Sequence, residues 1–534
     1  MPSSVEDEQV FIDHAHSLLD EHIDHLRSRI ITTANAPSTG TGQDELEREA
    51  LLDNLRLQLH AAEAARPRMC FGRLRFDGGD DHHIGRIGMR DNAGDVLLID
   101  WRAPQAAPFY QATNKNPMDV VLRRRIATRP SPQGPHVTHV DDETFDGTHE
   151  AVDPSLSAME APRSGRMADI LATIASDQDA IIRSDLDQVT IVQGGPGTGK
   201  TVVALHRAAW LLYTHRQRLA RDGVLIVGPS NVFLHYIDQV LPSLGETDVV
   251  LLTPRQLYPD VRPTADDSRD VARIKGSDRM ARVVARAVAA RVRIPHKGLT
   301  LATHTGMRIR LSSEEIEQAS KGISRSRRFH DGRDPFLRRV LQQAARNVAR
   351  DTGHDPEDRE YCDDLIASMV EDSTVRREFN LMWLPTTAER IIGHLLTDAS
   401  ILDEAATGIL TADERAALLR PPDAPWTSDD LPLLDEAADA LGPWEPPSTA
   451  PPDVPDYREL QASDAYRIRP SHSGGNAGSL ADRAIDDREW VYGHVIVDEA
   501  QELSAMAWRA IRRRASRRSM TAVGDLQQSS HRAG

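Results

Sequence analysis

A glycine-rich stretch constrains the fold of this chain more than any other feature. It reads Gly194-Gly195-Pro196-Gly197-Thr198-Gly199-Lys200-Thr201. The apolar run before it, residues 189–192, predicts a buried parallel strand, and the apolar residues after it recur with the period of a helix packed on a sheet. This order predicts a phosphate-binding loop, whose backbone N–H groups curl around a phosphate at the positive helix end. Lys200 then reaches the oxygens of the β- and γ-phosphates of a nucleotide, and Thr201 offers a hydroxyl to Mg²⁺.

A second apolar run, residues 495–497, ends in two carboxylates. In such an arrangement Asp498 holds Mg²⁺ through water and Glu499 polarises the attacking water. Together with the glycine loop, the run predicts a site for ATP, or GTP, with Mg²⁺.

The composition narrows the class of protein. The 534 residues suffice for three or four domains, and no window approaches the roughly 18 apolar residues of a membrane span. Cys70 and Cys362 are too few and too far apart for a disulfide framework, and the acidic N-terminus lacks the pattern of a signal peptide. We therefore expect a cytoplasmic protein without membrane contact. A formal charge of −17 argues against a surface made to coat nucleic acid and favours a basic partner.

Two helical stripes predict an antiparallel hairpin over residues 1–66. Apolar residues recur every three or four positions in residues 11–30 and again in residues 46–62, and the turn-forming residues 34–42 separate the two stripes. The narrow stripe favours a protruding coiled coil. The alternative is a pair of amphipathic helices lying flat on the body of the protein.

Residues 67–165 predict a small β-rich subdomain. Short strands separated by glycine-containing turns are expected at residues 69–76, 82–90, 96–101 and 120–128. The pair His82 and His83 suggests a metal site, but no further Cys or His stands at ligand spacing, so we interpret both as surface histidines.

Part of this subdomain resembles a known family. The residues that carry the resemblance are Ile84-Gly85-Arg86-Ile87-Gly88-Met89-Arg90-Asp91, Ile99-Asp100-Trp101-Arg102-Ala103-Pro104 and Pro108-Phe109-Tyr110. They resemble the N-terminal signature of HelD, a helicase-like factor of Gram-positive bacteria that binds RNA polymerase. The resemblance implies that the hairpin enters the secondary channel of the polymerase and an inserted domain enters its main channel. There the factor releases nucleic acid or recycles stalled polymerase, and some actinobacterial relatives affect rifamycin sensitivity.

Two further segments resemble motifs of superfamily 1 helicases. Gln178, on a helix expected over residues 167–183, resembles the glutamine that reads the adenine edge of the nucleotide. Residues 228–231 resemble motif Ia, which touches single-stranded DNA in those helicases. A strand-to-helix turn capped by Ser230 or Asn231 explains the same residues equally well.

The last segment, residues 521–528, resembles motif III, with Gln528 at the place of the residue that senses the γ-phosphate. In superfamily 1 a second RecA-like domain follows and brings arginines that complete the site. Because this sequence stops at Gly534, we expect a truncated or split product, or a partner that supplies the missing half. Hydrolysis by the chain alone should then be weak, and we expect a monomer.

Residues 255–490 predict a mainly α insertion between the two parts of the motor domain, residues 166–254 and 491–534. The insertion begins Arg-rich and then turns acidic, with about 27 Asp and Glu against about 9 Arg between residues 351 and 470. A proline cluster, residues 446–455, indicates a linker. The acidic half is either a solvated face or a surface that occupies a basic nucleic-acid channel of a partner.

These observations and the resemblance together predict an α/β fold. It would hold a P-loop (RecA-like) parallel-sheet motor domain, an N-terminal helical hairpin, a small β-rich subdomain and a large, mainly α insertion. The expected function is an NTP-binding, helicase-like factor that binds core RNA polymerase. Two alternatives remain open: a UvrD-type DNA helicase or translocase that binds single-stranded DNA, and a truncated binding protein without hydrolysis.

Overall fold

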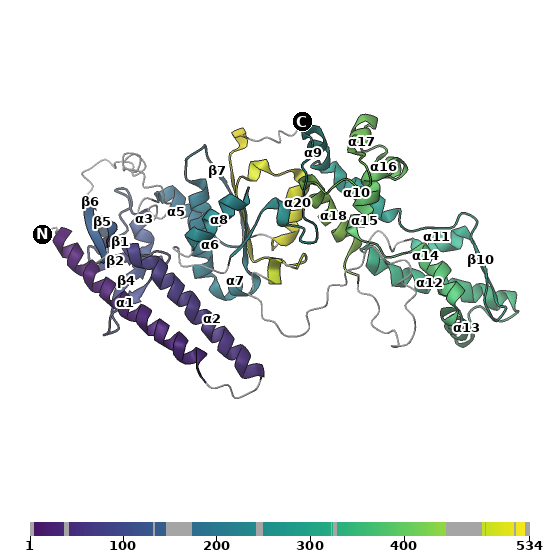
Figure 1. Cartoon of the computed structure of the whole chain (residues 1–534), viewed down its shortest axis with the longest axis horizontal. Coiled ribbons are helices and arrows are strands. Elements are labelled where there is room, and N and C mark those ends of the chain that lie inside the picture. The colour runs from purple at the N-terminus through teal and green to yellow at the C-terminus, as the bar shows by residue number, and fades with distance from the viewer. Residues whose placement is uncertain are drawn as a thin grey trace. The chain divides into compact units, whose positions relative to one another are not determined.

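A computed structural model describes most of the chain, in two compact units (Figure 1). The described residues are 5–36, 42–131, 134–145, 174–241, 249–321, 323, 328–444, 483–485, 487–516 and 519–528. The first unit, which we call the sheet unit, comprises residues 1–254, 476–503 and 513–534, and the second, the helical unit, comprises residues 255–475 and 504–512. The fold is mixed α/β with a parallel sheet, which confirms the predicted class at this level. Among the described helices, none has both the length and the apolar character that a bilayer crossing requires.

The N-terminal hairpin consists of α1 (Val5–Ala34) and α2 (Gly42–Ala65), which pack against each other. The first half of α1 lies on a sheet, because Ile12, Ala15 and Leu19 share a core with Ile126 and Val137. Figure 1 shows the far end of the hairpin away from those strands. The prediction of a protruding coiled coil is therefore wrong for the base of the hairpin, where the alternative of helices packed on the body holds.

The sheet under α1 has six strands in the order β3-β4-β2-β1-β5-β6. Its strands are β1 (Cys70–Phe76), β2 (Asp81–Gly85), β3 (Met89–Arg90), β4 (Val96–Asp100), β5 (Val120–Ser131) and β6 (Gly134–Thr144). The sequence did not predict β6, which pairs with β5 along its whole length. Short helical segments flank the strands: η1 (Arg66–Arg68), η2 (Pro104–Ala106) and α3 (Ala107–Gln111).

A second sheet of the same unit has five parallel strands in the order β7-β13-β12-β8-β9. These are β7 (Val189–Gln193), β8 (Val224–Val227), β9 (Val249–Leu252), β12 (His494–Val497) and β13 (Met520–Gly524). Strand β7 stands at an edge, and Val189 and Ile191 are 59% and 75% exposed, so the prediction of a fully buried strand is wrong there.

Four helices accompany the parallel sheet: α5 (Ser176–Ile182), α6 (Lys200–Thr214), α7 (Arg216–Asp222) and α8 (Asn231–Val240). Helix α5 is shorter than the helix predicted over residues 167–183, of which residues 167–173 lie outside the described part. Short turns η8 (Ala500–Glu502) and η9 (Leu526–Gln528) follow β12 and β13.

The two sheets of the sheet unit share one hydrophobic core. Trp101 and Phe109 come from the six-stranded half, while Val203 of α6 and Ile496 of β12 come from the parallel half, and all four belong to the same buried cluster. The predicted boundary between the β-rich subdomain and the motor domain, at residue 165, therefore does not separate two independently packed parts.

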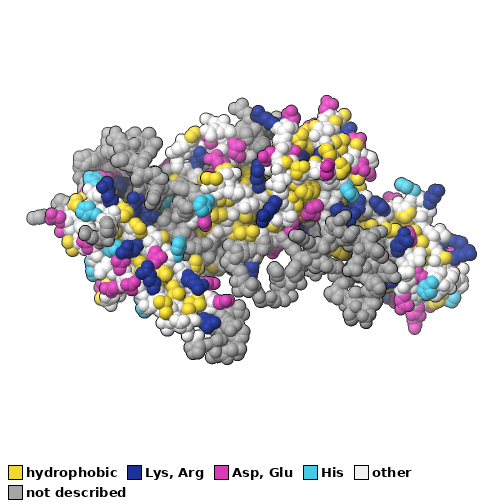
Figure 2. Space-filling view, in the orientation of Figure 1, with side chains coloured by type: hydrophobic (Ala, Val, Ile, Leu, Met, Phe, Trp, Pro, Cys, Tyr) yellow, Lys and Arg dark blue, Asp and Glu magenta, His cyan; other side chains and the backbone are white. Residues whose placement is uncertain are grey.

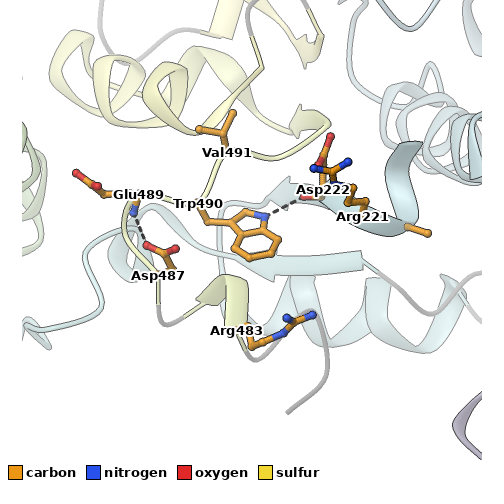
Figure 3. Close-up of a pocket in the computed structure, with 8 residues that line it drawn as sticks. Arg221, Asp222, Arg483, Asp487, Glu489, Trp490 and Val491 are labelled. Carbon is orange, nitrogen blue, oxygen red and sulfur yellow. Dashed lines mark hydrogen bonds between the residues drawn. The ribbon is translucent and has the colours of Figure 1, made fainter. Parts of the chain in front are cut away.

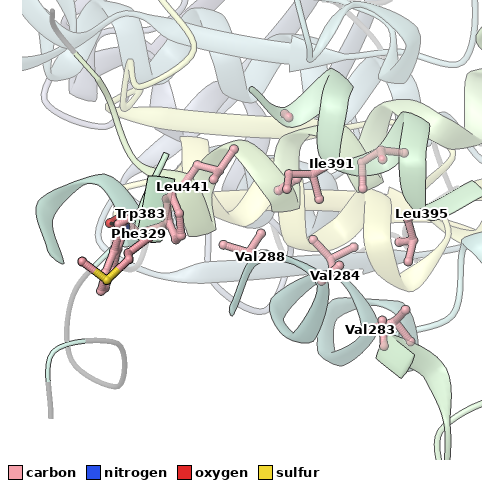
Figure 4. Close-up of a cluster of buried hydrophobic side chains, with 14 of the residues drawn as sticks. Val283, Val284, Val288, Phe329, Trp383, Ile391, Leu395 and Leu441 are labelled. Atoms are coloured by element: carbon pink, nitrogen blue, oxygen red, sulfur yellow. Dashed lines mark hydrogen bonds between the residues drawn. The ribbon is translucent and has the colours of Figure 1, made fainter. Parts of the chain in front are cut away.

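The described part of the helical unit contains helices and one two-stranded ribbon. Its helices are α9 (Arg269–Lys275), α10 (Arg279–Ala289), α11 (Ser313–Ser320), α12 (Phe329–Asp351), α13 (Arg359–Glu371), α14 (Ser373–Met382), α15 (Ala388–Thr397), α16 (Ala399–Ala406), α17 (Ala412–Leu418), α18 (Leu431–Leu441) and the first part of α20 (Ala505–Arg514). The ribbon pairs β10 (Leu299–Ala302) with β11 (Arg308–Leu311). Figure 4 shows its core, in which Val284 and Val288 of α10 lie beside Ile391 and Leu395 of α15.

Oppositely charged halves of the insertion pair with each other inside the helical unit. Residues 279–350 contain 17 Lys and Arg against 5 Asp and Glu, and the residues that follow are acidic. Ion pairs join the two halves, such as Arg279 with Glu414 at 2.6 Å and Arg328 with Asp439 at 3.4 Å. On the face shown in Figure 2, both signs of charge are mixed over this unit. Part of the acidic surface predicted to face a partner thus pairs within the chain, and the proline cluster lies outside the described residues.

Candidate nucleotide site

The glycine-rich loop joins the end of β7 to the start of α6. Gly197 and Gly199 have φ angles of 75° and 81°, a left-handed backbone that side chains other than glycine adopt only with strain. Lys200 Nζ folds back over the loop and donates to the carbonyl oxygens of Gly194 and Gly195, at 2.8 and 2.9 Å. The ammonium group therefore lies at the mouth of the loop, where it can exchange these carbonyls for ligand oxygens.

Thr201 and Asp498 meet beside the loop although 297 positions separate them. Thr201 Oγ1 donates to Asp498 Oδ2 at 2.8 Å. Parallel pairing of β7 with β13 and of β13 with β12 brings the two strand ends to one sheet edge. Burial raises the pKa of Asp498, although the bond from Thr201 and the charge of Lys200 oppose the shift. A hydroxyl and a buried carboxylate next to the glycine-rich loop form an oxygen pair of the kind that Mg²⁺ prefers.

Glu499 follows Asp498 in a strained backbone conformation. Its φ of 48° is one of three positive values among the described residues other than glycine. Such a conformation costs about 1–3 kcal/mol and persists only where the surroundings fix it. Gln501 supplies part of that support, because its Nε2 donates to Glu499 Oε2 at 2.5 Å and its Oε1 accepts from the backbone N–H of Asp525 at 2.9 Å. Gln501 thus ties the ends of β12 and β13 together.

Gln178 reaches the same loop from α5. Its Nε2 donates to the carbonyl oxygen of Thr198 at 3.3 Å, and its Oε1 accepts from the backbone N–H of Ala175 at 3.2 Å. The side-chain amide is therefore held against the loop, and the adenine-reading role that the resemblance implies for Gln178 remains a prediction.

Two other predicted elements make no side-chain hydrogen bond to the glycine loop, Thr201 or Asp498 within the described residues. Ser230 Oγ accepts from the backbone N–H of Phe233 at 3.2 Å and so caps α8, as the helix-turn alternative for residues 228–231 expects. Gln528 lies exposed in η9, and its side chain makes no hydrogen bond with any described residue. The roles that the resemblance implies for both remain predictions.

A buried polar network beside α6, the helix that follows the glycine loop, was not predicted from the sequence. Arg207 of α6 is fully buried; its Nε donates to Thr521 Oγ1 at 2.9 Å, and its other nitrogens donate to carbonyls at the end of α5 and just after it. His494 of β12 contacts Ser519 and Thr521 through its two ring nitrogens, at 2.8 and 3.0 Å. Burial and the nearby Arg207 lower the pKa of His494 to about 3. The sequence offered only a weak signal for it, one polar side chain in each otherwise apolar strand: His494 in β12 and Thr521 in β13.

Residues of the HelD-like signature contact the helix that follows the loop. The Trp101 ring packs edge-on against His206 of α6, with ring centroids 5.3 Å apart. Arg183, just after α5, donates to the carbonyl oxygens of Trp101 and Arg102 at 2.8 and 3.2 Å. Gln111 of α3 donates to Asp179 of α5 at 2.7 Å. The signature thus fastens the six-stranded sheet to α5 and α6.

His83 is not the surface histidine that the sequence predicts. Its Nε2 lies 3.0 Å from Glu8 Oε2, and its ring stacks on Phe11 with centroids 3.5 Å apart. Among the described residues, no three His, Cys, Asp or Glu side chains gather as metal ligands would.

A surface pocket of about 610 Å³ lies elsewhere in the sheet unit (Figure 3). Trp490 closes one side, with its Nε1 donating to the carbonyl oxygen of Asp222 at 2.9 Å. Its charged lining residues are Arg221, Asp222, Arg483, Asp487 and Glu489. None of the residues lining the pocket belongs to the glycine loop, and its lining holds three carboxylates against two arginines, so it does not compete with the loop as the candidate site for an anion.

Comparison with protein families gives one match. Residues 5–155 match the family described as DNA helicase IV HelD, N-terminal domain. None of the curated proteins compared with the chain matches it. The matched residues include the hairpin, the six-stranded sheet and the signature around Trp101. The match shows that residues 5–155 are similar to the N-terminal domain of HelD.

Proposed function

We propose that the chain binds a nucleoside triphosphate with Mg²⁺ at the glycine loop. The observation that carries the proposal is the 2.8 Å bond between Thr201 and Asp498, which joins the loop to a carboxylate 297 residues away. The residues fit such a ligand: Gly195 and Gly197 have open space where a Cβ would stand, so a phosphate could approach their backbone. ATP and GTP are both compatible with these contacts.

Each side chain then has a distinct role. Lys200 would bind the β and γ oxygens in place of the loop carbonyls, while Thr201 and Asp498 would hold the cation, directly or through water. Glu499, oriented by Gln501, would polarise the attacking water, and Gln178 would sense the occupied loop. The bound Mg²⁺ would neutralise charge on the phosphate groups. The resemblance to superfamily 1 implies that arginines from another domain complete the site, so turnover by this chain alone should be slow.

The test is Mg-nucleotide binding by the 534-residue chain. Lys200→Ala should weaken the affinity for a fluorescent nucleotide by roughly 100-fold or more, because a charge-assisted contact to two phosphates is lost. Lys321→Ala is the matched control: it removes an exposed lysine of the helical unit whose only ion pair among the described residues, with Glu317, spans 3.4 Å. Equal nucleotide affinity in the Lys200→Ala variant would refute the site.

We further propose that the chain is a helicase-like factor that binds core RNA polymerase and releases or recycles it from nucleic acid. The HelD-type N-terminal domain supports this proposal. The experiment mixes the intact chain with core polymerase and a labelled DNA–RNA scaffold at two salt concentrations. Displacement of the scaffold, weaker at high salt, is expected. Tight binding to free single-stranded DNA without affinity for polymerase would favour a UvrD-type helicase instead.

A further inference from the structure

Four basic residues of the helical unit lie on α15 and on the segment that follows α10, the helix that packs against α15. Arg291 and Arg293 follow the end of α10, while Arg390 and His394 stand one turn apart on α15. The backbone N–H of Arg293 donates to the carbonyl oxygen of Met382 at 2.8 Å, which ties the segment after α10 to the end of α14. We call these four residues the Arg291 cluster.

The cluster stands on a rigid base. Val284 and Val288 of α10 are buried against Ile391 and Leu395 of α15 (Figure 4). Because Arg390 and His394 are the sequence neighbours of these two α15 residues, and Arg291 follows Val288 by less than one turn, packing fixes the positions from which the basic side chains extend.

The cationic groups repel one another. Burial lowers the pKa of the Arg291 guanidinium, and the charges of Arg293 and Arg390 lower it further. Burial also lowers the pKa of His394, again with a contribution from Arg291 and Arg390. Arg291 Nε is buried and has no hydrogen-bond partner among the described residues. Holding a half-buried cation beside two like charges is unfavourable unless an anion compensates it.

Two carboxylates that are close to the cluster in sequence accept hydrogen bonds elsewhere. Asp398 raises the pKa of His394, but its Oδ1 accepts from the backbone N–H groups of Ser400 and Ile401, at 2.9 and 3.3 Å, and so caps α16. Glu389, next to Arg390, accepts from Tyr258 Oη at 2.7 Å. Among the described residues, no ion pair joins a carboxylate to Arg291, Arg293 or Arg390 at 4.0 Å or less.

We propose that the Arg291 cluster binds a phosphate group. Guanidinium groups match phosphate oxygens with paired hydrogen bonds, and three of them around one half-buried position suit a compact, multiply charged anion. The net charge of −17 disfavours an extended nucleic-acid track, so the site would hold one phosphate, either free or as part of a nucleic-acid strand. The proposal does not depend on the glycine loop, which belongs to the other unit.

The test uses the intact chain carrying Lys200→Ala, which removes any phosphate bound at the glycine loop. Calorimetry with inorganic phosphate and pyrophosphate reports a free anion, and fluorescence anisotropy with a single-stranded oligonucleotide reports a strand. In this background Arg291→Gln and Arg390→Gln should each weaken binding of the preferred probe by roughly 10-fold or more. If the strand is preferred, each change should also lower the salt dependence of its affinity by about one unit.

Arg282→Gln is the matched control, because Arg282 is an exposed arginine of α10 with no ion pair among the described residues. If Arg291→Gln folds poorly, two other variants carry the same test. Arg293→Gln changes an exposed position, and Arg291→Lys keeps the positive charge but removes the planar guanidinium group. Three outcomes would overturn the proposal: no saturable binding of any phosphate probe, an equal loss in the Arg282→Gln variant, or preference for an acidic peptide over all phosphate probes.

Discussion

Glu8 should contribute strongly to the stability of the sheet unit. Its carboxylate, 0% exposed, accepts hydrogen bonds from Arg73 at 2.7 Å and Arg124 at 2.8 Å and lies 3.0 Å from His83 Nε2. Burial alone would raise the pKa of Glu8, but these three partners outweigh it and hold the pKa far below the ordinary value of 4.5. Because the partners come from three strands, the carboxylate fastens α1 to the sheet.

Glu8→Gln keeps the shape of the side chain and removes the charge that half-buried Arg73 and buried Arg124 share, although each arginine keeps one other carboxylate, Asp81 and Asp142. Breaking a buried ion pair from one side typically costs about 3–5 kcal/mol. At roughly 2 °C per kcal/mol for a unit of this size, the midpoint of thermal unfolding should fall by about 6–10 °C. Since the folded pKa is depressed, the contribution of Glu8 is present above about pH 4.5 and is lost as the pH falls further.

The assay is denaturant unfolding of the intact chain, with hydrogen exchange of α1 as a local readout. Glu6→Gln is the matched control on the same helix, because Glu6 is exposed, and it should change the free energy of unfolding by no more than about 0.5 kcal/mol. A loss below about 1 kcal/mol in Glu8→Gln, with unchanged exchange of α1, would refute the argument that this carboxylate holds the hairpin to the sheet.

Three further changes test other parts of the molecule. Gln501→Ala frees Glu499 and Asp525, so turnover should fall by roughly 10-fold or more in a hydrolysis assay while Mg-nucleotide affinity changes little; equal loss of both would contradict a positioning role. Trp383→Ala removes a buried ring that packs on Phe329 and Phe336, and the helical unit should lose about 3–5 kcal/mol in denaturant unfolding. Burial lowers the folded pKa of His494 to about 3 from 6.5, so its contribution is complete above pH 6.5 and falls by about 1.4 kcal/mol per pH unit below that. Urea unfolding at pH 7 and pH 5 should show this loss in the native chain and a smaller one in His494→Asn.

The sequence predicted those parts of the fold that local patterns encode. Apolar runs ending in a glycine loop and in Asp498 identified β7, α6 and β12, and the parallel sheet brought Thr201 to Asp498. Strand β6 was not predicted because Asp141, Asp142 and Glu143 interrupt its apolar pattern. Its pairing depends on arginines of β5, such as Arg124 with Asp142, which no pattern within β6 reveals.

The remaining misses have the same origin in long-range contacts. The amphipathic stripe of α1 is the same whether the helix faces a partner helix or a sheet, so it could not distinguish a free coiled coil from one anchored through Glu8. Gln501 was visible in the sequence directly after Asp498, Glu499 and Ala500. Its role depends on the backbone N–H of Asp525, which only the neighbouring strand supplies.

The order of strands in the parallel sheet has a consequence for synthesis of the protein. Strand β12 pairs with β8 on one side and with β13 on the other. Within the described residues β7 pairs only with β13, which follows it in the sequence by more than 300 positions. At ~5–20 residues per second, β7 and the glycine loop therefore leave the ribosome roughly 15–60 s before their partner strand exists. During that interval the exposed side chains of Val189 and Ile191 accompany an unpaired strand edge, a template for pairing with other chains. The yield of native protein should thus depend on how quickly the helical unit is translated and folds.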